Sequence, residues 1–566
     1  MNPIIKKILE SRNLTVSQYN ELNQNLMYNE LHGLDQMSSY IDKCYYIQDE
    51  ITILPDFDMD GISAGSLSFA GFSELGLKVN LFVPNPKEGY GFTGDTILEL
   101  LRRYPNTKYL FTCDTGITCY EGIEVAKALG LTVLLSDHHR QKTSEICADV
   151  IVNPNGFDNE HLYFKDYCGA TVVYKILQHY CKHYRPDKLQ QIEALQVLAG
   201  IGTISDLMEL SYDNRVIVSN MTQYMSDILH NRAVFLQNAE SLYYKNLFRN
   251  LSYLMRTETL SIGLDGEYFD EEYIGYYFAP MMNSIKRLEE DVREAFLFFF
   301  QSNTELSQKS LYRLKQFNTI RKENVKEFYE KLDSFSDFIF ISEAKKGILG
   351  LLAQKQMSST NLPTIVLNQN LDGSYSGSAR SPVYYPLNTI LSDVGIICSG
   401  HQHSFGVFIE NEMQLELVHQ TIETTFKGYL NDYIEETKNL PHYDVLLSKD
   451  DVTGLDSPIF DYFYNISYLK PFGRGFPDPI FAFECDLSDG NLIFMGKEKN
   501  HVKLEFDYFS CILFFYKQFK PDFILDNFKT SDERYTGKVR FIGNLKVNCF
   551  RDSYTINLLV TKVEIL

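Results

Sequence analysis

Acidic and imidazole side chains stand directly after three apolar runs of the chain. They are Asp56, Asp58 and Asp60 after ITILP, Asp114 after YLFTC, and Asp137, His138 and His139 after LTVLLS. Several carboxylates at one place repel one another unless cations bind them. Mixed Asp and His donors suit Mn²⁺, and Mg²⁺ suits sites where oxygen ligands dominate. These residue types therefore predict a site for divalent metal ions.

Each aspartate taken alone has a simpler explanation. An Asp directly after a strand commonly caps the next helix or closes an Asx-turn, and Asp114 and Asp137 would both fit that role. The metal interpretation rests on three such loops in succession, one of them with two histidines. Asp206 in GTISD, after a mostly helical stretch, is a further candidate ligand.

Other sites of this kind are excluded or weakly indicated. DFDMDG matches the start of an EF-hand loop, but its twelfth position is Leu67 where a bidentate Glu is needed. His179 and His183 have metal-like spacing on an expected helix, where a packed or solvated face is the better interpretation. The sequence contains no HExxH, GxxxxGK[ST] or GxSxG motif.

The elements that must position these residues are strands of a parallel sheet. From about residue 51 to 210, apolar β-type runs alternate with helical stretches. This pattern predicts an open α/β fold, in which ligands bind outside the carboxyl ends of the strands. If the first strands pair side by side, the three acidic loops meet at one edge.

The rest of the chain predicts three further parts. Residues 285–335 are charged with apolar residues at helical spacing, which indicates long helices. A second, smaller α/β unit follows at 336–430, with strands expected at DFIFISE, GILGLLA, TIVLN and GVFIE. Beyond about residue 440, short strands dominate and predict a small antiparallel barrel.

Two glycine-rich stretches of the second α/β unit form another candidate site. They are GSARS at 377–381 and SGHQHSFG at 399–406. Small residues such as Gly377 and Ser378 bring backbone amides close to an anion, and Arg380 offers a two-pronged contact for phosphate. His401 and His403 are candidate donors to phosphate oxygens. A glycine-rich turn with satisfied histidines explains the stretches equally well.

Composition limits the class of protein. A chain of 566 residues exceeds one core, and 44% hydrophobic with 22% charged residues is typical of ordered globular domains. The N-terminal stretch has no apolar signal-peptide core, and no apolar run approaches the length of a membrane span. Ten cysteines without paired spacing favour a reducing cytoplasm. The net charge of −21 argues against a general nucleic-acid-coating protein but permits an enzyme with carboxylate-held cations.

The ordered set of motifs resembles the DHH phosphoesterase superfamily and, within it, the RecJ single-stranded-DNA exonucleases. The motifs span roughly residues 40–560 in RecJ order: DFDMDG, GYGF, CDTG, SDHH, CGATVVYKIL, GTISDLMEL, PMMNSIKR, GSARS, SGHQHSFG and PFGRGFPDPIF. DHH alone is a weak signal, whereas the ordered set is specific.

The resemblance implies a domain plan that agrees with the pattern above. It places an N-terminal helical segment at 1–50, a DHH catalytic domain at 51–284, a connecting helix at 285–335, a DHHA1 substrate-binding domain at 336–430 and an OB-fold at 431–566.

The resemblance also implies an activity, 5′-to-3′ hydrolysis of single-stranded DNA to mononucleotides in repair and recombination, with two ions of Mn²⁺ or Mg²⁺. A helicase or single-strand-binding protein is an expected partner. Asp58 and Asp60 are expected to ligate one ion each and Asp114 to bridge them. His138 is expected to complete the shell of one ion, and Asp206 is expected to contribute a further ligand.

The remaining site residues receive roles in catalysis or DNA binding. His139 is expected to face the scissile phosphate, with Asp137 and Asp56 orienting the ligands. The DNA contacts are expected from Arg380, Ser378, Gly377, His401, His403, Asn283, Arg287, Lys87 and Tyr90. Asn85 is followed by Pro86 and Lys87, where RecJ proteins usually carry Arg, so Lys87 is expected to replace that contact as a point charge. Ser399 and Phe405 also depart from the usual pattern.

Two other functions stay open. One is a DHH phosphodiesterase acting on short oligoribonucleotides, cyclic dinucleotides or pyrophosphate, against which the C-terminal barrel counts. The other is a catalytically silent DNA-binding or replisome scaffold, which the net charge mildly favours and the complete ligand motifs oppose.

Overall fold

The structure is a computed structural model of the whole chain, and it describes residues 2–26, 29–84, 92–262, 269–438, 442–454, 456–519, 525–528, 535–550 and 553–566. The chain forms two compact units. One comprises residues 27–208 and 220–439, and the other comprises residues 1–26, 209–219 and 440–566.

The larger unit begins with a parallel sheet of five strands in the order β2-β1-β3-β4-β5. Its strands are β1 (Glu50–Pro55), β2 (Lys78–Leu81), β3 (Thr107–Cys113), β4 (Thr132–Ser136) and β5 (Val150–Val152). Every neighbouring pair is parallel. The parallel sheet that the alternating sequence pattern predicts is thus confirmed.

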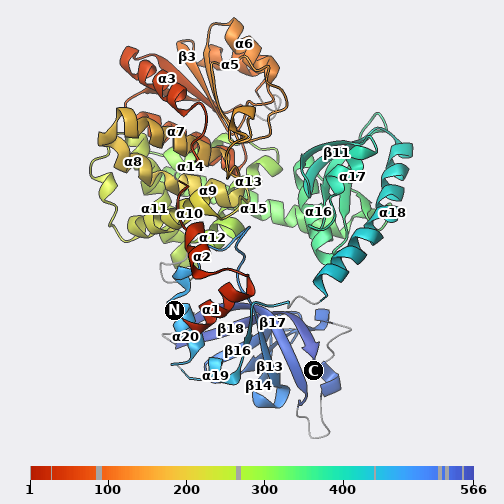
Figure 1. Ribbon diagram of the computed structural model, residues 1–566. Coiled ribbons are helices and arrows are strands. Elements are labelled where there is room, and N and C mark those ends of the chain that lie inside the picture. Colours follow the sequence, from red (N-terminus) through yellow and green to blue (C-terminus); the bar gives the residue numbers. More distant parts are fainter. Residues whose placement is uncertain are drawn as a thin grey trace. The chain divides into compact units, whose positions relative to one another are not determined.

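Helices cover both faces of this sheet. They are α3 (Leu34–Ile47), α4 (Met59–Glu74), α5 (Gly94–Arg103), α6 (Tyr120–Ala128) and α7 (Gly169–Tyr184). Apolar residues of α5 and α6 pack with Leu54, Leu110 and Val133 on one face, while α4 and α7 contact the strands from the other. Figure 1 shows α5 and α6 on one side of β3 and α3 on the opposite side.

Helix α4 is buried along nearly its whole length, which explains its composition of small and apolar residues. Asp58 caps its start by accepting a hydrogen bond from the Gly61 N–H at 3.2 Å. A Cβ at Gly61 would lie closer than 3.0 Å to the Asp56 backbone, so only glycine permits this tight turn. This capping bond and this close approach define the turn from Asp56 to Gly61 at the sheet edge.

A helical layer continues the chain after α7. Its members are α8 (Leu189–Ala194), α9 (Gln196–Ser205), α10 (Tyr212–Leu229), α11 (Leu242–Ile262), α12 (Glu271–Tyr273), a π-helical turn (Ile274–Phe278), α13 (Ala279–Arg287), α14 (Arg293–Phe300) and α15 (Thr304–Glu330). The expected long helix is α15, which has 27 residues. Phe298 and Phe299 of α14 are fully buried.

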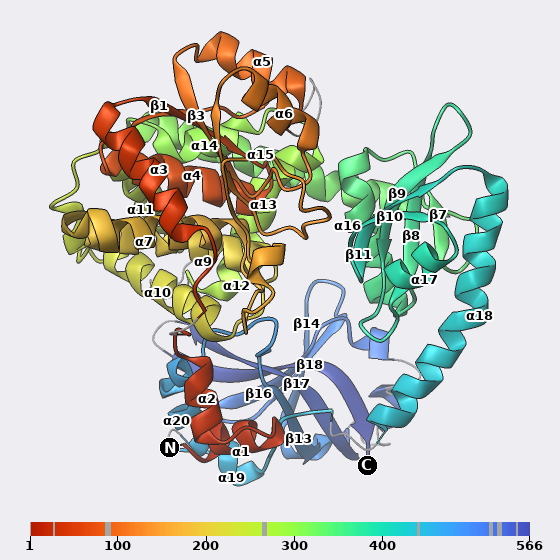
Figure 2. The ribbon, with the colours of Figure 1, turned by 45° about the horizontal axis from the view of Figure 1, so that its top comes forward.

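The second sheet of this unit has the order β10-β11-β9-β8-β7-β6, with only β7 and β8 parallel. Its elements are β6 (Asp333–Ser334), β7 (Ile339–Ile341), α16 (Lys346–Thr360), β8 (Thr364–Gln369), β9 (Tyr375–Arg380), α17 (Leu387–Asp393), β10 (Ile397–His401), β11 (Ser404–Ile409) and α18 (Glu412–Thr437). Figure 2 shows α16 and α17 beside these strands. Alternate strand residues face the two sides: Phe340 and Val366 pack on α16, and Ile339 and Ile365 on α17 and α18.

The strand predicted at GILGLLA is wrong, because residues 347–353 form the first half of α16. Leucine and alanine favour a helix, and the following residues QKQMSS continue it. Ile348, Leu349 and Leu352 are buried at helical spacing, on the face that meets the sheet. A short apolar run does not by itself distinguish a buried strand from a buried helix.

The smaller unit contains a seven-stranded sheet in the order β12-β13-β17-β18-β16-β15-β14. Its elements are α1 (Pro3–Ser11), α2 (Val16–Leu22), β12 (Val445–Leu447), α19 (Lys449–Val452), α20 (Pro458–Tyr464), β13 (Ile480–Asp486), β14 (Asn491–Met495), β15 (His501–Glu505), β16 (Phe509–Leu513), β17 (Lys538–Phe550) and β18 (Ser553–Ile565). Most pairs are antiparallel, as predicted, but β12–β13 and β16–β18 are parallel.

Helices α1 and α2 pack against this sheet and not against β1, the first strand after them in the sequence. Ile4, Ile8 and Tyr19 lie in one core with residues of β13, β16 and β18. Figure 1 shows α1 and α2, in red, beside the blue strands of the C-terminal part. Segments from the two ends of the sequence therefore share one hydrophobic core.

Arg215 ties a third segment into this core. It has no exposed surface. Its guanidinium donates to the carbonyl oxygens of Leu469 (2.5 Å) and Pro471 (2.8 Å), to Tyr19 Oη (2.9 Å) and to Asn23 Oδ1 (2.7 Å). The start of α10 is thus fixed to both the N-terminal and the C-terminal segments.

None of the described helices has both the length and the apolar character needed to cross a membrane. Nine cysteines are described as free thiols, six of them buried.

Candidate metal centre

Backbone pairing brings the three acidic loops together at the carboxyl edge of the first sheet. The Asp56 N–H donates to the Cys113 carbonyl, and the Asp114 N–H donates to the Ser136 carbonyl, each at 3.1 Å. The Asp137 N–H continues the ladder to Val152 at 3.2 Å. Because β1, β3 and β4 are neighbours, Asp56, Asp114 and Asp137 stand side by side, as the alternating sequence pattern predicts.

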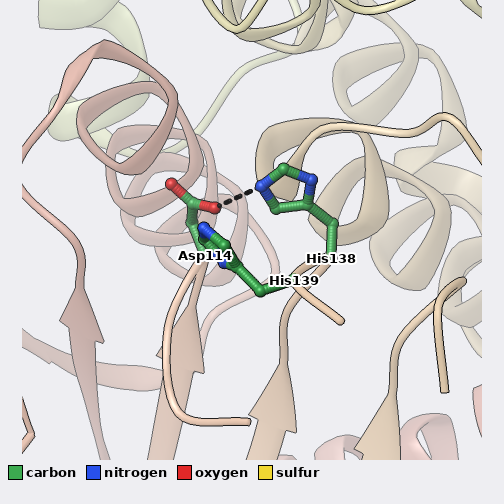
Figure 3. Close-up of side chains that lie close together, drawn as sticks. All are labelled: Asp114, His138 and His139. Carbon is green, nitrogen blue, oxygen red and sulfur yellow. Dashed lines mark ion pairs between the residues drawn. The ribbon is translucent and has the colours of Figure 1, made fainter. Parts of the chain in front are cut away.

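One group of candidate ligands surrounds the His138 ring. Its Nε2 lies 3.1 Å from Asp114 Oδ1, 3.7 Å from Asp206 Oδ2 and 3.8 Å from Asp60 Oδ2. Figure 3 shows Asp114 and His138 pointing toward each other, with the His139 ring close by. Asp206 reaches the group from the C-terminal end of α9. Asp60, His138 and Asp206 are close enough together to hold one cation.

A second group lies beside the first and shares Asp114. Its other members are Asp56 and Asp58, and the three carboxylates are close enough together to hold a cation. The Nζ atom of Lys286 on α13 lies 3.5 Å from Asp58 Oδ2 and 3.7 Å from Asp56 Oδ2. The two groups therefore differ, since a lysine ammonium already faces the second.

Asp60 is held by the N-terminus of α7. The Gly169 N–H donates to Asp60 Oδ2 at 2.6 Å, and the Ala170 N–H donates to Asp60 Oδ1 at 3.0 Å. A Cβ at Gly169 would lie closer than 3.0 Å to the Asp114 side chain, and one at Gly202 closer than 3.0 Å to Asp60 Oδ1. Glycine at both positions makes room for the carboxylates, which explains the GA and GT pairs in these motifs.

Both carboxylate oxygens of Asp137 are engaged in hydrogen bonds within the protein. It is buried, and its Oδ1 accepts from the His138 N–H (2.7 Å), the His139 N–H (3.1 Å) and His139 Nδ1 (2.8 Å). Its Oδ2 accepts from the Ile117 N–H at 2.9 Å. This pairing fixes the His139 ring, so that its Nε2 is directed away from Asp137.

Two asparagines after β5 hold the backbone of the histidine pair. Asn153 Nδ2 donates to the His139 carbonyl at 2.9 Å, and Asn155 Nδ2 donates to the His138 carbonyl at 2.6 Å. Asp114 itself has φ of 60°, in the left-handed region that non-glycine residues rarely adopt. Such backbone strain persists where the surrounding structure enforces it, as it does at many functional sites.

The pKa values of the ligand groups are strongly perturbed. Burial and the neighbouring carboxylates of Asp60 and Asp58 raise the pKa of Asp114 well above its usual range. Burial and Asp60 raise the pKa of Asp206 to about 7. Burial also raises the pKa of Asp56 to about 6, against the opposing effect of Lys286. At Asp58 burial acts in the same direction, but Lys286 and the Gly61 N–H outweigh it and lower the pKa.

The two histidines are shifted toward the charged form. A hydrogen bond to Asp137 raises the pKa of His139 to about 9. Burial works against protonation of His138, but Asp60 and Asp206 outweigh it and raise its pKa. Both shifts reflect the same excess of negative charge, which is the environment that attracts cations.

The residues present fit a divalent metal ion. Asp114 Oδ1 and Asp206 Oδ2 are buried oxygen atoms without a hydrogen-bond partner in the described part of the chain. Buried polar atoms are normally satisfied, so such orphans call for an explanation such as an ion. Both atoms face the His138 Nε2, and oxygen with imidazole nitrogen is a donor set that Mn²⁺ accepts.

An arginine cluster lies where α13, α15 and β9 approach α16. Arg287 Nη1 donates to the Gly347 carbonyl at 3.2 Å, and Arg380 packs against Gly350. Burial and Arg287 lower the pKa of Arg380 to about 10, and burial with Arg321 lowers the pKa of Arg287. Arg321 Nε is buried and has no hydrogen-bond partner among the described residues. Like charges gathered in this way suit an anion such as a phosphate.

A hollow of about 240 Å³ opens on the second sheet, and it contains part of the predicted DNA site. Gly377 and Ser378 line it together with Ser399, Gly406 and Lys346. A Cβ at Gly377 would meet the β8 backbone closer than 3.0 Å, so the glycine is required for strand packing as well. Arg380 follows on the same strand, outside the residues that line the hollow.

The remaining predicted DNA contacts are scattered. His401 ends β10, and His403 stands in the β10–β11 turn with its Nδ1 atom 3.1 Å from Ser381 Oγ. Asn283 Oδ1 accepts from the Met59 N–H at 2.8 Å, which fastens α13 to the loop of Asp58. Lys87 and Tyr90 lie outside the described residues.

Sequence reasoning missed Lys286, Arg321, Asn153 and Asn155. Lys286 lies in PMMNSIKR, three residues after Asn283 and one before Arg287, and helical spacing places all three on related faces. That spacing would have been enough to add Lys286 to the candidate site residues. Arg321 sits in a charged helix where nothing distinguishes it from its neighbours, and the asparagines act only through backbone carbonyls.

Two family descriptions match the chain. The DHH family, N-terminal domain, matches residues 50–201, and the RecJ OB domain matches residues 450–562. These matches confirm the resemblance and the fold class that the motifs predict. They also agree with the parallel sheet and the C-terminal strands of the structure.

Curated relatives align over most of the chain. A Haemophilus influenzae protein described as single-stranded-DNA-specific exonuclease RecJ is 23% identical, and the alignment covers 100% of this chain and 96% of that protein. A Bacillus subtilis protein of the same description is 26% identical over 84% of this chain and 57% of its own length.

Solved structures share the fold. The crystal structure of RecJ in complex with Mn²⁺ from Thermus thermophilus superposes with a TM-score of 0.72 at 18% identity, covering 100% of this chain and 76% of that one. A second structure, exonuclease RecJ bound to manganese, gives a TM-score of 0.52 at 20% identity over 70% of this chain and 95% of that one.

Proposed function

We propose that this chain is a metal-dependent exonuclease that hydrolyses single-stranded DNA. It carries the DHH domain and the RecJ-type OB domain of the RecJ branch of the DHH family. The relatives named for that activity and the convergence of buried carboxylates on His138 support the proposal. The single observation that carries it is the pair of buried oxygens of Asp114 and Asp206, which face His138 but have no hydrogen-bond partner among the described residues. The 5′-to-3′ polarity and mononucleotide products follow from the family resemblance.

Two divalent ions, Mn²⁺ by preference and Mg²⁺ as an alternative, would be held by this chain. Asp60, His138 and Asp206 would hold one, Asp56 and Asp58 would face the other, and Asp114 would be shared. When bound, such ions lower the pKa of a water molecule and neutralise charge on the phosphoryl oxygens.

The protein's own groups orient the reaction. Asp137 accepts from His139 Nδ1 and so presents the Nε2 side of that ring to a phosphoryl oxygen, where a donated proton would stabilise developing negative charge. Asn153 and Asn155 hold the backbone of the histidine pair in place. Gly169 and Gly202 keep space for the carboxylates, so the ligand positions are set before substrate arrives.

DNA phosphates would be bound by the arginine cluster. Arg287, Arg321 and Arg380 concentrate positive charge on a molecule whose net charge is −21. Gly377, Ser378, His401 and His403 extend that surface along the second sheet. Tyrosine and phenylalanine supply the only aromatic stacking platforms, since tryptophan is absent.

A shorter DHH phosphodiesterase is less well supported, because residues 450–562 match a RecJ OB domain. A silent scaffold is disfavoured by the intact convergence of ligands at His138. We also propose a cytoplasmic site of action, in keeping with the free cysteines, and a strand-separating helicase or single-strand-binding protein as a partner in DNA repair.

The test is a nuclease assay with Mn²⁺ on single-stranded DNA labelled at its 5′ or 3′ end, with duplex DNA and short RNA as comparisons. We expect release of mononucleotides from the 5′ end of single-stranded DNA. Asp114→Ala should abolish hydrolysis while DNA binding in EDTA survives. Full activity of that variant, or preference for short RNA, would contradict the proposal.

A further inference from the structure

The two candidate cation groups are electrostatically unequal. Around His138, the described lysines and arginines make no ion pair with Asp60, Asp114 or Asp206. Beside Asp56 and Asp58, by contrast, stands the ammonium of Lys286, 3.5 Å from one carboxylate and 3.7 Å from the other. Among the described residues, the first group therefore has no lysine or arginine partner, and the second has a lysine.

Lys286 is held at this position by its surroundings. Asn283, one turn earlier on α13, accepts from the Met59 N–H and fastens the helix to the acidic loop. The Lys286 Nζ also lies 5.3 Å from the centre of the Phe57 ring, in a cation–π contact. The ammonium is thus anchored by the same loop whose carboxylates it neutralises.

We propose that Lys286 acts as a built-in cation for the Asp56–Asp58 carboxylates, so that this group binds a divalent ion more weakly than the Asp60–His138–Asp206 group. This inference rests on the metal centre of the proposed function and adds the order of loading. The His138 group fills first. The Asp58 group fills at higher concentration, because an ion there must approach or displace a like charge.

The size of the effect follows from Coulomb's law. A divalent ion within a few ångströms of an ammonium is repelled strongly enough, at the effective dielectric constant of a protein site, to weaken binding by about tenfold or more. The ammonium of Lys286 lies directly against both carboxylates, so an ion bound by them would stand within a few ångströms of it.

The experiment counts Mn²⁺ ions bound to the full chain without DNA. Loss of the free Mn²⁺ signal in electron paramagnetic resonance, with calorimetry alongside, gives the affinities of the two ions. We expect one tight and one weak ion for the wild type, with dissociation constants about tenfold or more apart. Lys286→Met keeps the apolar stem, removes the charge and should bring the two constants together.

Three further variants make the result specific. Lys286→Arg keeps the charge and should keep the inequality. Lys286→Gln is a second neutral variant that should behave like Lys286→Met, and it replaces that variant if the latter does not fold. Lys309→Met removes an exposed lysine paired with Glu305 on α15 and should match the wild type.

Equal affinities in the wild type, or an unchanged ratio in both neutral variants, would overturn the role of Lys286. If the wild type nevertheless hydrolyses single-stranded DNA with Mn²⁺, only this inference fails. Absence of any Mn²⁺ binding would overturn both the inference and the metal centre on which the proposed function rests.

Discussion

At the scale of single residues, the candidate metal centre depends on glycines, which leave space because they have no side chain, as much as on ligands. Gly169 and Gly202 stand where any Cβ would press against the carboxylates of Asp114 and Asp60. Lys286 and the two asparagines after β5 supply charge and orientation without being candidate ligands. Substitution of these supporting residues therefore tests the geometry while leaving every ligand in place.

Gly169→Ala should weaken Mn²⁺ binding without unfolding the protein. Alanine is a good residue for the first turn of α7, but its Cβ would collide with the Asp114 side chain. Overpacking costs about 1–3 kcal/mol, so displacement of Asp114 should lower Mn²⁺ affinity about tenfold to a hundredfold. Mn²⁺ titration measures this loss.

The matched control for that variant is Gly428→Ala in α18, where a Cβ would meet nothing within 4 Å. It should leave Mn²⁺ affinity unchanged and raise helix stability by about 0.5–1 kcal/mol. Unaltered Mn²⁺ affinity in Gly169→Ala would show that Asp114 does not need the space that this glycine provides.

Arg321→Ala should weaken single-stranded DNA binding in EDTA. Its buried Nε lacks a hydrogen-bond partner among the described residues, so a phosphate contact would satisfy it. Loss of one phosphate contact should reduce the slope of log affinity against log salt by about 0.7. Arg313→Ala on the same helix, whose guanidinium is paired with Glu294, is the control and should keep the slope. Equal slopes for the two variants would remove Arg321 from the DNA site.

At the scale of elements, the sequence predicted the strands and helices whose apolar residues recur with a clear period. The strands of the first sheet and the three acidic loops follow from alternation and from residues such as Asp114 and Asp137 at strand ends. The helix α16 was mistaken for a strand, because a short apolar run such as GILGLLA lacks a period long enough to decide. The convergence of Asp206, from the end of α9, on His138 depends on tertiary packing that no local pattern encodes.

The N-terminal helices provide a second example of that limit. The sequence placed them before the first strand, but Tyr19 and Arg215 join them to the C-terminal sheet. Contacts between residues hundreds of positions apart produce no hydrophobic periodicity in the sequence. A buried arginine in α10 looks like any helical surface residue until its partners are known.

Arg215→Ala should destabilise the smaller unit. The guanidinium satisfies the carbonyl oxygens of Leu469 and Pro471 inside the core, and its removal leaves them buried without these donors. Each unsatisfied buried group costs about 1–3 kcal/mol, so the total loss should be about 3 kcal/mol or more. Urea unfolding followed by circular dichroism measures it.

Arg215→Lys is the informative comparison. A single ammonium cannot reach four acceptors in fixed directions, so this variant should recover only part of the stability. Arg232→Ala, which removes an exposed pair with Asp227, should change the free energy of unfolding by no more than about 1 kcal/mol. A loss in Arg215→Ala as small as that of the control would contradict the anchoring role.

At the scale of the whole molecule, the net charge of −21 and the proposed substrate carry the same sign. Long-range attraction therefore does not bring DNA to this protein, and local cations must do so. The arginine cluster supplies some of them, and divalent ions bound at the acidic edge would supply the rest. Under the proposed function, the metal centre would serve DNA binding as well as chemistry, and its carboxylates repel one another when no ion is bound.

Mn²⁺ should consequently raise the stability of the folded chain. An ion that binds only the native state stabilises it by about 2.7 kcal/mol when present at a hundred times its dissociation constant. The melting temperature, measured by differential scanning fluorimetry, should rise with Mn²⁺ concentration and fall back when EDTA is added.

Asp114→Asn keeps the shape of the side chain but removes a shared ligand charge, so its melting temperature should respond much less to Mn²⁺. The same variant should be more stable than the wild type in EDTA, because burial and repulsion from Asp60 and Asp58 already disfavour the charged form of Asp114. A full Mn²⁺ response in Asp114→Asn would place the stabilising ion elsewhere on the chain.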